Sequence, residues 1–331
     1  MAFAVTFLIF FLMSFSPIDP AYNALGESAT PEQIQAYHEE YGLDDPWPVR
    51  YVRYMGDLLH GDLGTYSARR NSVAERISKA LPVTMQLTFL GLLIGAVVSF
   101  LLGIIAALYR DKWPDQLIRL LSIAGLATPS FWLAVLLILV FSSFMHLLPA
   151  SGALPSPLTN FGGYMGRMIM PAIALAVPLT GQMTRIVRTA MVEELDKDYV
   201  QTAKGSGLPQ KVIIARNVLR NALITPVTTL GMKIGYLMGG AVVIEVIFNL
   251  PGMGMAILDG VAGNEPNLIM GVVIVVAFSF IIINIVVDML YLLINPTIRS
   301  VSPCSPKGKK TPRSSRAWRS PRAPSSPASR T

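Results

Sequence analysis

The residue types that usually carry catalysis or bind metals are scattered in this chain of 331 residues. The three histidines, His38, His60 and His146, have no Glu or Cys partner at metal-ligand spacing. The single cysteine, Cys304, leaves no pair for a disulfide or a metal clip. Gly308-Lys309-Lys310 lacks the upstream glycine and the hydroxyl residue of a phosphate-binding loop. The sequence therefore predicts that the chain holds no metal ion, binds no cofactor and is not an enzyme. If ATP drives this protein, a partner chain is expected to hydrolyse it.

Three charged side chains interrupt apolar stretches: Lys233, Glu245 and Asp288. A charge at the centre of a bilayer costs about 2.5 to 3.5 kcal/mol on insertion scales, so such residues usually face an aqueous path or a partner. Lys233 and Glu245 are therefore candidate residues of a translocation path. The alternative is that a charge near the end of a span reaches the membrane surface or supports packing, and it applies to Glu245 and Asp288.

These charges lie in a chain whose apolar residues come in long blocks. Of all residues, 52% are hydrophobic and 14% are charged, which is typical of a membrane protein. About 20 apolar residues cross a bilayer as a helix. Five spans are predicted, three without Asp, Glu, Lys or Arg (80–109, 120–145 and 268–287), one with two prolines (168–184) and one interrupted by Lys233 (221–244).

Residues 1–16 predict the first of six spans. The apolar part, residues 1–15, is short for a crossing at a rise of 1.5 Å per residue. A signal peptide is the alternative, but the segment has no basic n-region and no small-x-small cleavage site. We therefore expect a span whose start is missing or misassigned.

The distribution of basic residues orients the predicted spans. Most of the 27 Lys and Arg residues lie in residues 110–119, in residues 185–220 and beyond the last span. Basic residues are retained in cytoplasmic loops, so both termini are expected inside and residues 17–79 outside. In that outer loop, Thr30-Pro31-Glu32-Gln33 predicts a capped helix that Gly42 ends, and a second short helix is expected at residues 48–60.

The last residues, 300–331, differ in composition from the rest. They are rich in Pro, Ser, Lys and Arg and contain no acid. Such a segment cannot bury enough apolar surface to offset chain entropy, so we expect a disordered basic tail. Binding of anionic lipid or RNA is an alternative use of the charge. Retention on the cytoplasmic side already accounts for it, and no nucleic-acid partner is expected.

Two rows of small residues predict where helices pack. Small residues at every fourth position let two helix backbones approach and gain dispersion contacts. The first row is Gly91, Gly95, Ser99 and Gly103, and the second is Gly231, Gly235 and Gly239. The rows predict a tightly packed bundle or a dimer. Together with the spans, they predict an all-α fold, a polytopic bundle of membrane helices.

Residues 191–224 predict a short helix held between two spans on the cytoplasmic side. Asp198 can cap a helix that continues through Lys204, and Gly205 or Gly207 can end it. A second helical run is expected at residues 209–223. A short helix in this position can act as a lever between the membrane and a partner.

The residues of this lever resemble a known motif. The segment Asp198-Tyr199-Val200-Gln201-Thr202-Ala203-Lys204-Gly205-Ser206-Gly207, followed by Arg220-Asn221-Ala222-Leu223, is similar to the cytoplasmic loop of binding-protein-dependent ABC importer permeases. That loop is built on Glu-Ala-Ala, three residues and Gly, and Gln201, Thr202, Ala203 and Gly207 stand at these positions. The resemblance implies an ATPase-coupling loop formed by Asp198, Tyr199, Gln201, Thr202, Ala203, Lys204, Gly205 and Gly207. Gln201 lacks the acidic group of the family pattern, so docking is expected without an ion pair at that position.

Other motifs narrow the resemblance to the dipeptide, oligopeptide and nickel permeases. They are Gly61-Asp62-Leu63-Gly64, Thr128-Pro129-Ser130-Phe131-Trp132, Leu148-Pro149-Ala150-Ser151-Gly152, Glu245-Val246-Ile247-Phe248 with Pro251-Gly252-Met253-Gly254, and Asp288 with Asn295-Pro296-Thr297-Ile298-Arg299. The resemblance covers residues 3–299. The chain departs from the family at both ends and at Lys233, where an uncharged residue is more usual.

The resemblance implies a six-span subunit with the type I ABC importer permease fold and a permease core at residues 80–299. Its implied partners are a second, similar permease, two ATPase subunits or domains that bind ATP and Mg, an extracytoplasmic substrate-binding protein and the lipid of the cytoplasmic membrane. The implied cargo is a di- or oligopeptide, with nickel or another small solute as the alternative. An ion-coupled secondary transporter is a further alternative, but the sequence shows no second copy of its proline-interrupted pattern.

Overall fold

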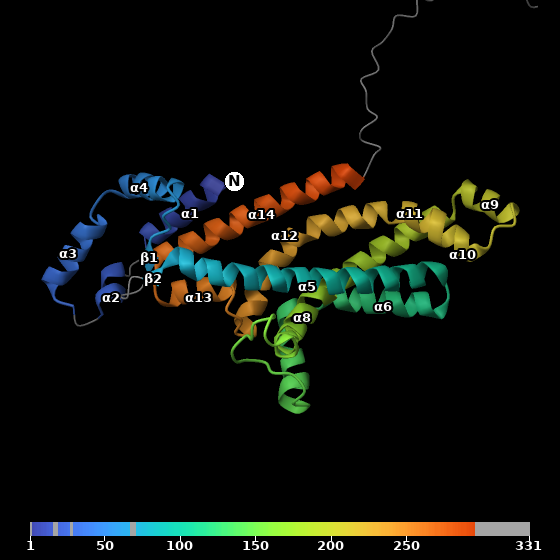
Figure 1. The fold of residues 1–331 in the computed structure, drawn as a ribbon, viewed down its shortest axis with the longest axis horizontal. Helices are drawn as coiled ribbons and strands as arrows, with labels where there is room; N and C mark the ends of the chain where they lie inside the picture. The colour runs from blue at the N-terminus through green and yellow to red at the C-terminus, as the bar shows by residue number, and fades with distance from the viewer. Residues whose placement is uncertain (1, 16–18, 27–28, 67–70, 295–331) are drawn as a thin grey trace, which may run out of the picture. The chain divides into compact units, whose positions relative to one another are not determined.

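The computed structural model describes residues 2–15, 19–26, 29–66 and 71–294, so the predicted tail at residues 300–331 lies outside the described residues. Within them the chain is helical apart from one antiparallel hairpin of β1 (Thr65–Tyr66) and β2 (Asn71–Ser72) (Figure 1). The first helices are α1 (Ala2–Ser14), α2 (Pro20–Leu25), α3 (Pro31–Tyr41), α4 (Trp47–Leu59), α5 (Val73–Leu108), α6 (Trp113–Ala127), α7 (Ser130–Leu137) and the π-helix η1 (Ile138–Phe144). The others are α8 (Phe161–Leu195), α9 (Asp198–Gly205), α10 (Gln210–Val212), the π-helix η2 (Ile213–Val218), α11 (Leu219–Ala222), α12 (Ile224–Ile247), α13 (Met253–Ala262) and α14 (Pro266–Ile294).

Four of these helices, α5, α8, α12 and α14, are long and apolar enough to cross a membrane. They coincide with four of the predicted spans. A fifth crossing is formed by α6 with α7 and η1, if this bent pair is counted as one span.

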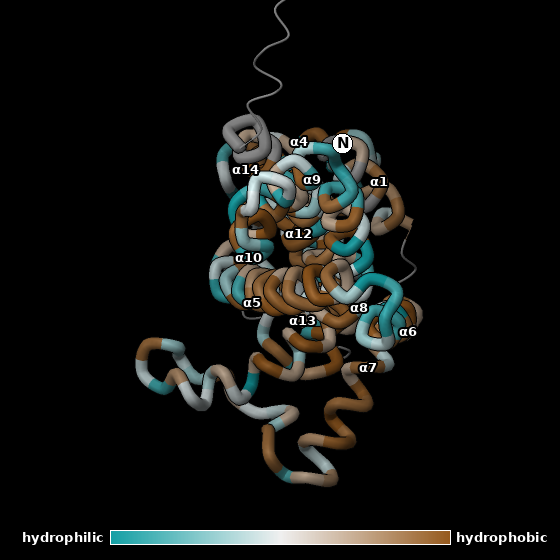
Figure 2. The backbone as a smooth tube through the Cα atoms, turned by 90° about the vertical axis from the view of Figure 1, so that its right-hand side faces the viewer, coloured by the Kyte–Doolittle hydropathy of each residue, from teal (hydrophilic) through white to brown (hydrophobic). Residues whose placement is uncertain are grey.

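The span predicted at residues 120–145 is not one continuous helix, and its crossing of the membrane stays a prediction. The chain bends by 99° between α6 and α7, at Thr128 and Pro129. Proline has no N–H to donate and disfavours helical backbone at the residue before it, and Thr128 has an extended ψ of 119°. After the break, the apolar helix α7 runs in a different direction from α6 (Figure 2) and still packs against α8 and α12.

The predicted first span is represented by α1, which has 13 residues. That is about 20 Å of helix, short of a hydrocarbon core of about 30 Å. The helix packs against α4 and α14, and Phe7 lies with its ring centroid 5.9 Å from that of Trp47 and 5.6 Å from that of Tyr51. A sixth crossing at α1 therefore stays a prediction.

The most extensive packing between spans joins α5 to α8, along the first predicted glycine row. A methyl group on Gly95 would lie 2.6 Å from Cδ2 of Leu179, and one on Gly103 would lie 2.6 Å from Cβ of Val187. Gly91 faces Leu175 in the same way. Since the partners advance along both helices together, α5 and α8 run parallel.

The second glycine row makes contacts within this chain at two of its three positions. Gly231 lies against Val287 and Gly235 against the ring of Phe280, so this row packs α12 against α14. A methyl group on Gly239 would meet no described atom within 4 Å, so Gly239 packs against no other helix in the described part of this chain, and its predicted packing role stays a prediction. One residue further, at a different angle around the helix, Gly240 faces Leu175 of α8 instead.

The segment from α2 to α4 is folded as predicted. Thr30 and Gln33 form the capping box of α3, and Gly42 ends that helix with a left-handed φ of 60°. His38 on α3 lies 2.8 Å from the carboxylate of Asp19, and this hydrogen bond raises the pKa of His38 above its ordinary value. Together, α3, α4 and the first residues of α14 line a cavity of about 770 Å³.

Exchanging Gly103 for alanine tests the α5–α8 contact. The added methyl would meet Val187 and the carbonyl of Thr184, so we expect destabilisation of about 1 to 3 kcal/mol, as for other overpacked sites. Gly239→Ala is the matched control, because its methyl meets open space and alanine favours a helix by about 1 kcal/mol over glycine. Thermal unfolding of the two purified variants in detergent measures the difference, and equal midpoints would contradict this account of the seam.

Candidate functional site

The predicted lever helix is α9, which follows α8 after a turn of two residues. Lys197, with extended φ and ψ of −72° and 148°, occupies the N-cap position. Asp198 is therefore the first residue of the helix, and its predicted role as the cap is wrong. Its carboxylate still lies in the first turn, where the helix dipole stabilises a negative charge. The helix ends at Gly205, and Gly207 follows with a left-handed φ of 77°.

One side of α9 is packed against the bundle. Val200 is fully buried in a cluster with Met191 of α8, Ile213 and Val218 of η2 and Ala222 of α11. Tyr199 and Ala203 pack against the same cluster and are half-buried. The second helical run predicted at residues 209–223 is present as α10, η2 and α11, and it supports α9 through this cluster.

A buried carboxylate fixes α9 to the end of α8. Glu194 accepts a hydrogen bond of 2.8 Å from the hydroxyl of Tyr199 and forms an ion pair of 2.6 Å with Nζ of Lys197. Burial and the contact with Glu194 raise the pKa of Tyr199, and the same carboxylate raises the pKa of Lys197. The phenol therefore stays protonated and the ammonium stays charged at neutral pH, so both remain donors.

The opposite side of α9 is exposed. Of the residues predicted to form the coupling loop, those that are exposed are Asp198, Gln201, Thr202, Lys204, Gly205 and Gly207. Leu208 is also exposed, by 46%, and continues this surface. Sequence reasoning missed both Leu208 and Glu194. The spacing of three residues between Glu194 and Lys197 could have indicated an ion pair at the boundary of a span and a polar helix.

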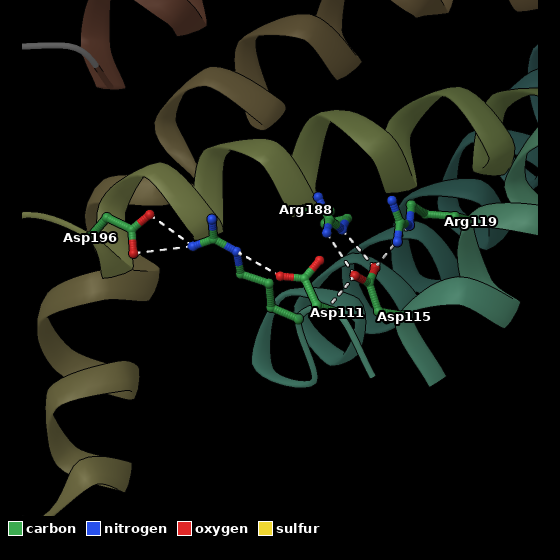
Figure 3. A network of polar contacts seen from close by, with 6 residues as sticks. Asp111, Asp115, Arg119, Arg188 and Asp196 are labelled. Atoms are coloured by element: carbon green, nitrogen blue, oxygen red, sulfur yellow. Dashed lines mark hydrogen bonds and ion pairs between the residues drawn. The ribbon is translucent and has the colours of Figure 1, made fainter. Parts of the chain in front are cut away.

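A network of ion pairs joins α8 near α9 to the turn between α5 and α6 (Figure 3). Arg188 of α8 donates to both carboxylate oxygens of Asp115 of α6, at 2.7 Å from Nε and 2.6 Å from Nη2. Asp115 is fully buried. Nearby, Arg110 pairs with Asp196 at 2.9 Å. No local pattern in the sequence indicates this network, because its members come from segments far apart in the chain.

The predicted path residues Lys233 and Glu245 lie on α12, one near its middle and one near its end. Glu245 is fully buried, and its Oε2 accepts a hydrogen bond of 2.7 Å from the backbone N–H of Gly254. That carboxylate therefore lies at the N-terminus of α13, where an anion is favoured. Lys233 is half-buried, with Nζ 5.8 Å from the centroid of the Tyr236 ring. The side chain of Asp288 lies outside the described part of the structure.

A cavity of about 300 Å³ lies beside the break between α6 and α7. Its polar lining is uncharged and comes from Thr128, Ser130, Gln182 and Tyr236. Lys233 does not line this cavity, and its nearest link to the lining is the ring of Tyr236. In the described part of the chain, no group of three or more His, Cys, Asp or Glu side chains is placed to hold a metal ion.

The arrangement defines a class of protein: a bundle of membrane helices with a short, fixed helix exposed at one end. Residues 99–300 match the family described as "Binding-protein-dependent transport system inner membrane component", and residues 1–88 match its N-terminal counterpart. The chain belongs to this family. It is a multi-pass inner-membrane permease subunit of a binding-protein-dependent ABC transporter, in which ATP hydrolysis and substrate capture belong to partners.

Relatives are similar over most of the chain. The "Probable D,D-dipeptide transport system permease protein DdpB" of Escherichia coli (strain K12) is 36% identical over 314 residues, which cover 89% of this chain and 92% of that protein. A "Putative peptide transport system permease protein" of Brucella abortus (strain 2308) is 35% identical, over 89% of this chain and 94% of that protein. The "Glutathione transport system permease protein GsiC" of Salmonella paratyphi A is also 35% identical, over 89% of this chain and 94% of that protein.

A solved structure supports the fold. The chain is similar to one titled "Inward facing conformations of the MetNI methionine ABC transporter", with a TM-score of 0.54 and 14% sequence identity. The match covers 66% of this chain and 96% of that chain. The predicted type I ABC importer permease fold is thereby confirmed.

Exchanging Gly207 for alanine tests the turn after α9. A left-handed backbone costs a residue with a side chain about 1 to 2 kcal/mol, so the turn should shift. We expect the amount of uptake per ATP hydrolysed to fall by about 5- to 30-fold, the factor that corresponds to this free energy. Gly56→Ala is the control, because Gly56 is helical, lies on α4 away from the predicted coupling loop, and an added methyl meets nothing within 4 Å. Uptake and ATP hydrolysis are measured with both variants in membranes. Equal uptake by the two would contradict a role for this turn.

Proposed function

We propose that this chain forms half of the translocation pathway of an ABC importer for di- or oligopeptides. The observation that carries the proposal is α9, whose exposed face is free to dock while its other face is fixed to α8 through Val200 and Glu194. The exposed residues would enter a cleft of the ATPase. Closure of that ATPase around ATP and Mg would then move α9, and α8 with it.

Peptide cargo is supported by the relatives, which are named for D,D-dipeptides, peptides and glutathione, itself a tripeptide. The uncharged polar lining of the cavity beside the helix break suits a peptide backbone, because amide and hydroxyl groups pair with backbone N–H and C=O of any sequence. Lys233, whose ammonium lies near the ring of Tyr236, would attract the carboxylate of a peptide. Nothing in the described residues favours nickel as cargo.

We propose the orientation predicted from the charges. The end that carries α9 would be cytoplasmic, with both termini on that side and residues 17–79 outside, facing the substrate-binding protein. In this division, residues 1–16 hold the first span, residues 80–299 the permease core and residues 300–331 a basic tail.

A second, similar permease would complete the pathway. Met232, Tyr236 and Val243 form an exposed stripe on α12, with relative exposures of 58%, 67% and 48%. Gly239 lies on the same stripe and faces open space. A stripe of this kind can contact a partner helix, face the translocation pathway or face lipid. A paired permease would provide the partner helix and the other wall of the pathway.

Labelling from the two sides of the membrane tests the orientation. In a Cys304→Ser background, Lys204→Cys on α9 should be protected from a membrane-impermeant maleimide in intact cells, and Leu59→Cys on α4 should react. Purification of the tagged chain in mild detergent should bring down an ATPase and a second permease. Labelling of Lys204→Cys from outside, or solute transport by the purified chain without companions, would overturn the proposal.

A further inference from the structure

Asp115 is a fully buried charge whose partners come from two elements. Besides the two hydrogen bonds from Arg188, its Oδ2 accepts the backbone N–H of Asp111 at 3.0 Å, and Arg119 lies 3.6 Å from Oδ1 (Figure 3). A paired, two-point contact between a guanidinium and a carboxylate fixes orientation as well as distance. The first turn of α6 is therefore held to α8 in one geometry.

The same two helices approach closely further along. A methyl group on Gly181 of α8 would lie 2.5 Å from the carbonyl oxygen of Ser122 and 2.9 Å from the backbone nitrogen of Leu126. Gly125 of α6 faces the carbonyl of Val177 in turn. Backbone contacts of this kind leave no flexible side chain to absorb a shift. With the ion pair at one end and glycines at the other, α6 and α8 are joined at two places along their contact.

This joint unit connects α9 to the break in the fifth crossing. Arg188 precedes Glu194, which fixes α9, by less than two helical turns. At the other end, Gly125 stands three residues before Thr128, where α6 bends away beside the cavity of about 300 Å³. A displacement of α9 would thus reach the wall of that cavity through α8 and α6.

We propose that the Asp115–Arg188 pair is a positioning link that determines how much transport each hydrolysed ATP produces. The inference rests on the proposed function, because it assigns the pair a place between the ATPase-docking helix and the pathway. The neighbouring Arg110–Asp196 pair is not assigned this role. Its side chains are 48% and 63% exposed, and exposed ion pairs contribute little free energy.

Two variants that keep every charge test the link: Arg188→Lys, which loses the two-point contact, and Asp115→Glu, which moves the carboxylate by one methylene. The complete transporter, with its ATPases and binding protein, is assembled in liposomes, and the number of cargo molecules imported per ATP hydrolysed is measured in the assembled fraction. We expect this ratio to fall about fivefold or more in both variants, the range of a typical coupling free energy. Asp196→Asn is the matched control and should keep the wild-type ratio.

A wild-type ratio in assembled complexes of both variants would overturn the inference, and so would an equal fall in Asp196→Asn. Poor assembly with an unchanged ratio in the assembled fraction would show that the pair serves stability alone, and would overturn it too. Failure of the wild-type transporter to import any peptide would instead contradict the proposed function, so the two failures are distinguishable.

Discussion

Glycines hold α5 and α8 at backbone distance, and the other contacts of the bundle are arranged around that pair. Lipid tails are as apolar as the side chains of a span, so helices gain little by hiding apolar surface and associate through close packing. Gly91, Gly95 and Gly103 permit that packing along three turns of α5. The same helix α8 also contacts α6, α7, α12 and α11, so it lies at the centre of the described structure.

The exposed helix α9 can be short because contacts with the end of α8 stabilise it. An isolated helix of eight residues is not stable in water, and α9 depends on its buried residue Val200 and on the carboxylate of Glu194. Those contacts belong to the end of α8 and to the run of α10, η2 and α11. A partner that pushes on α9 therefore pushes on a helix that spans the membrane.

The sequence predicted the parts of this structure that depend on local chemistry. The capping box at Thr30 and Gln33 and the stop at Gly42 could be predicted because capping depends on neighbours in the chain. The glycine row on α5 could be predicted because its spacing matches one face of a helix. Whether such a row meets a partner depends on the fold, and Gly239 shows the limit of the rule.

Long-range geometry could not be read in the same way. The bend at Thr128 and Pro129 depends on whether neighbouring helices accept a break, since Pro171 and Pro178 lie within a continuous α8. The pairing of Asp115 with Arg188 joins residues 73 positions apart, and no local pattern indicates it. The cap at Lys197 depends on how α8 ends, which sets the backbone of the next residues.

The proposed link requires that α9, α8 and α6 move as one body when the transporter uses ATP. The most direct measurement is the distance between spin labels on two exposed sites, Thr202 of α9 and Gln116 of α6, in the complete transporter. This account predicts the same distance distribution without nucleotide and with ATP trapped, while labels on the two paired permeases change their separation. A distribution that shifts or broadens between Thr202 and Gln116 on ATP binding would contradict it.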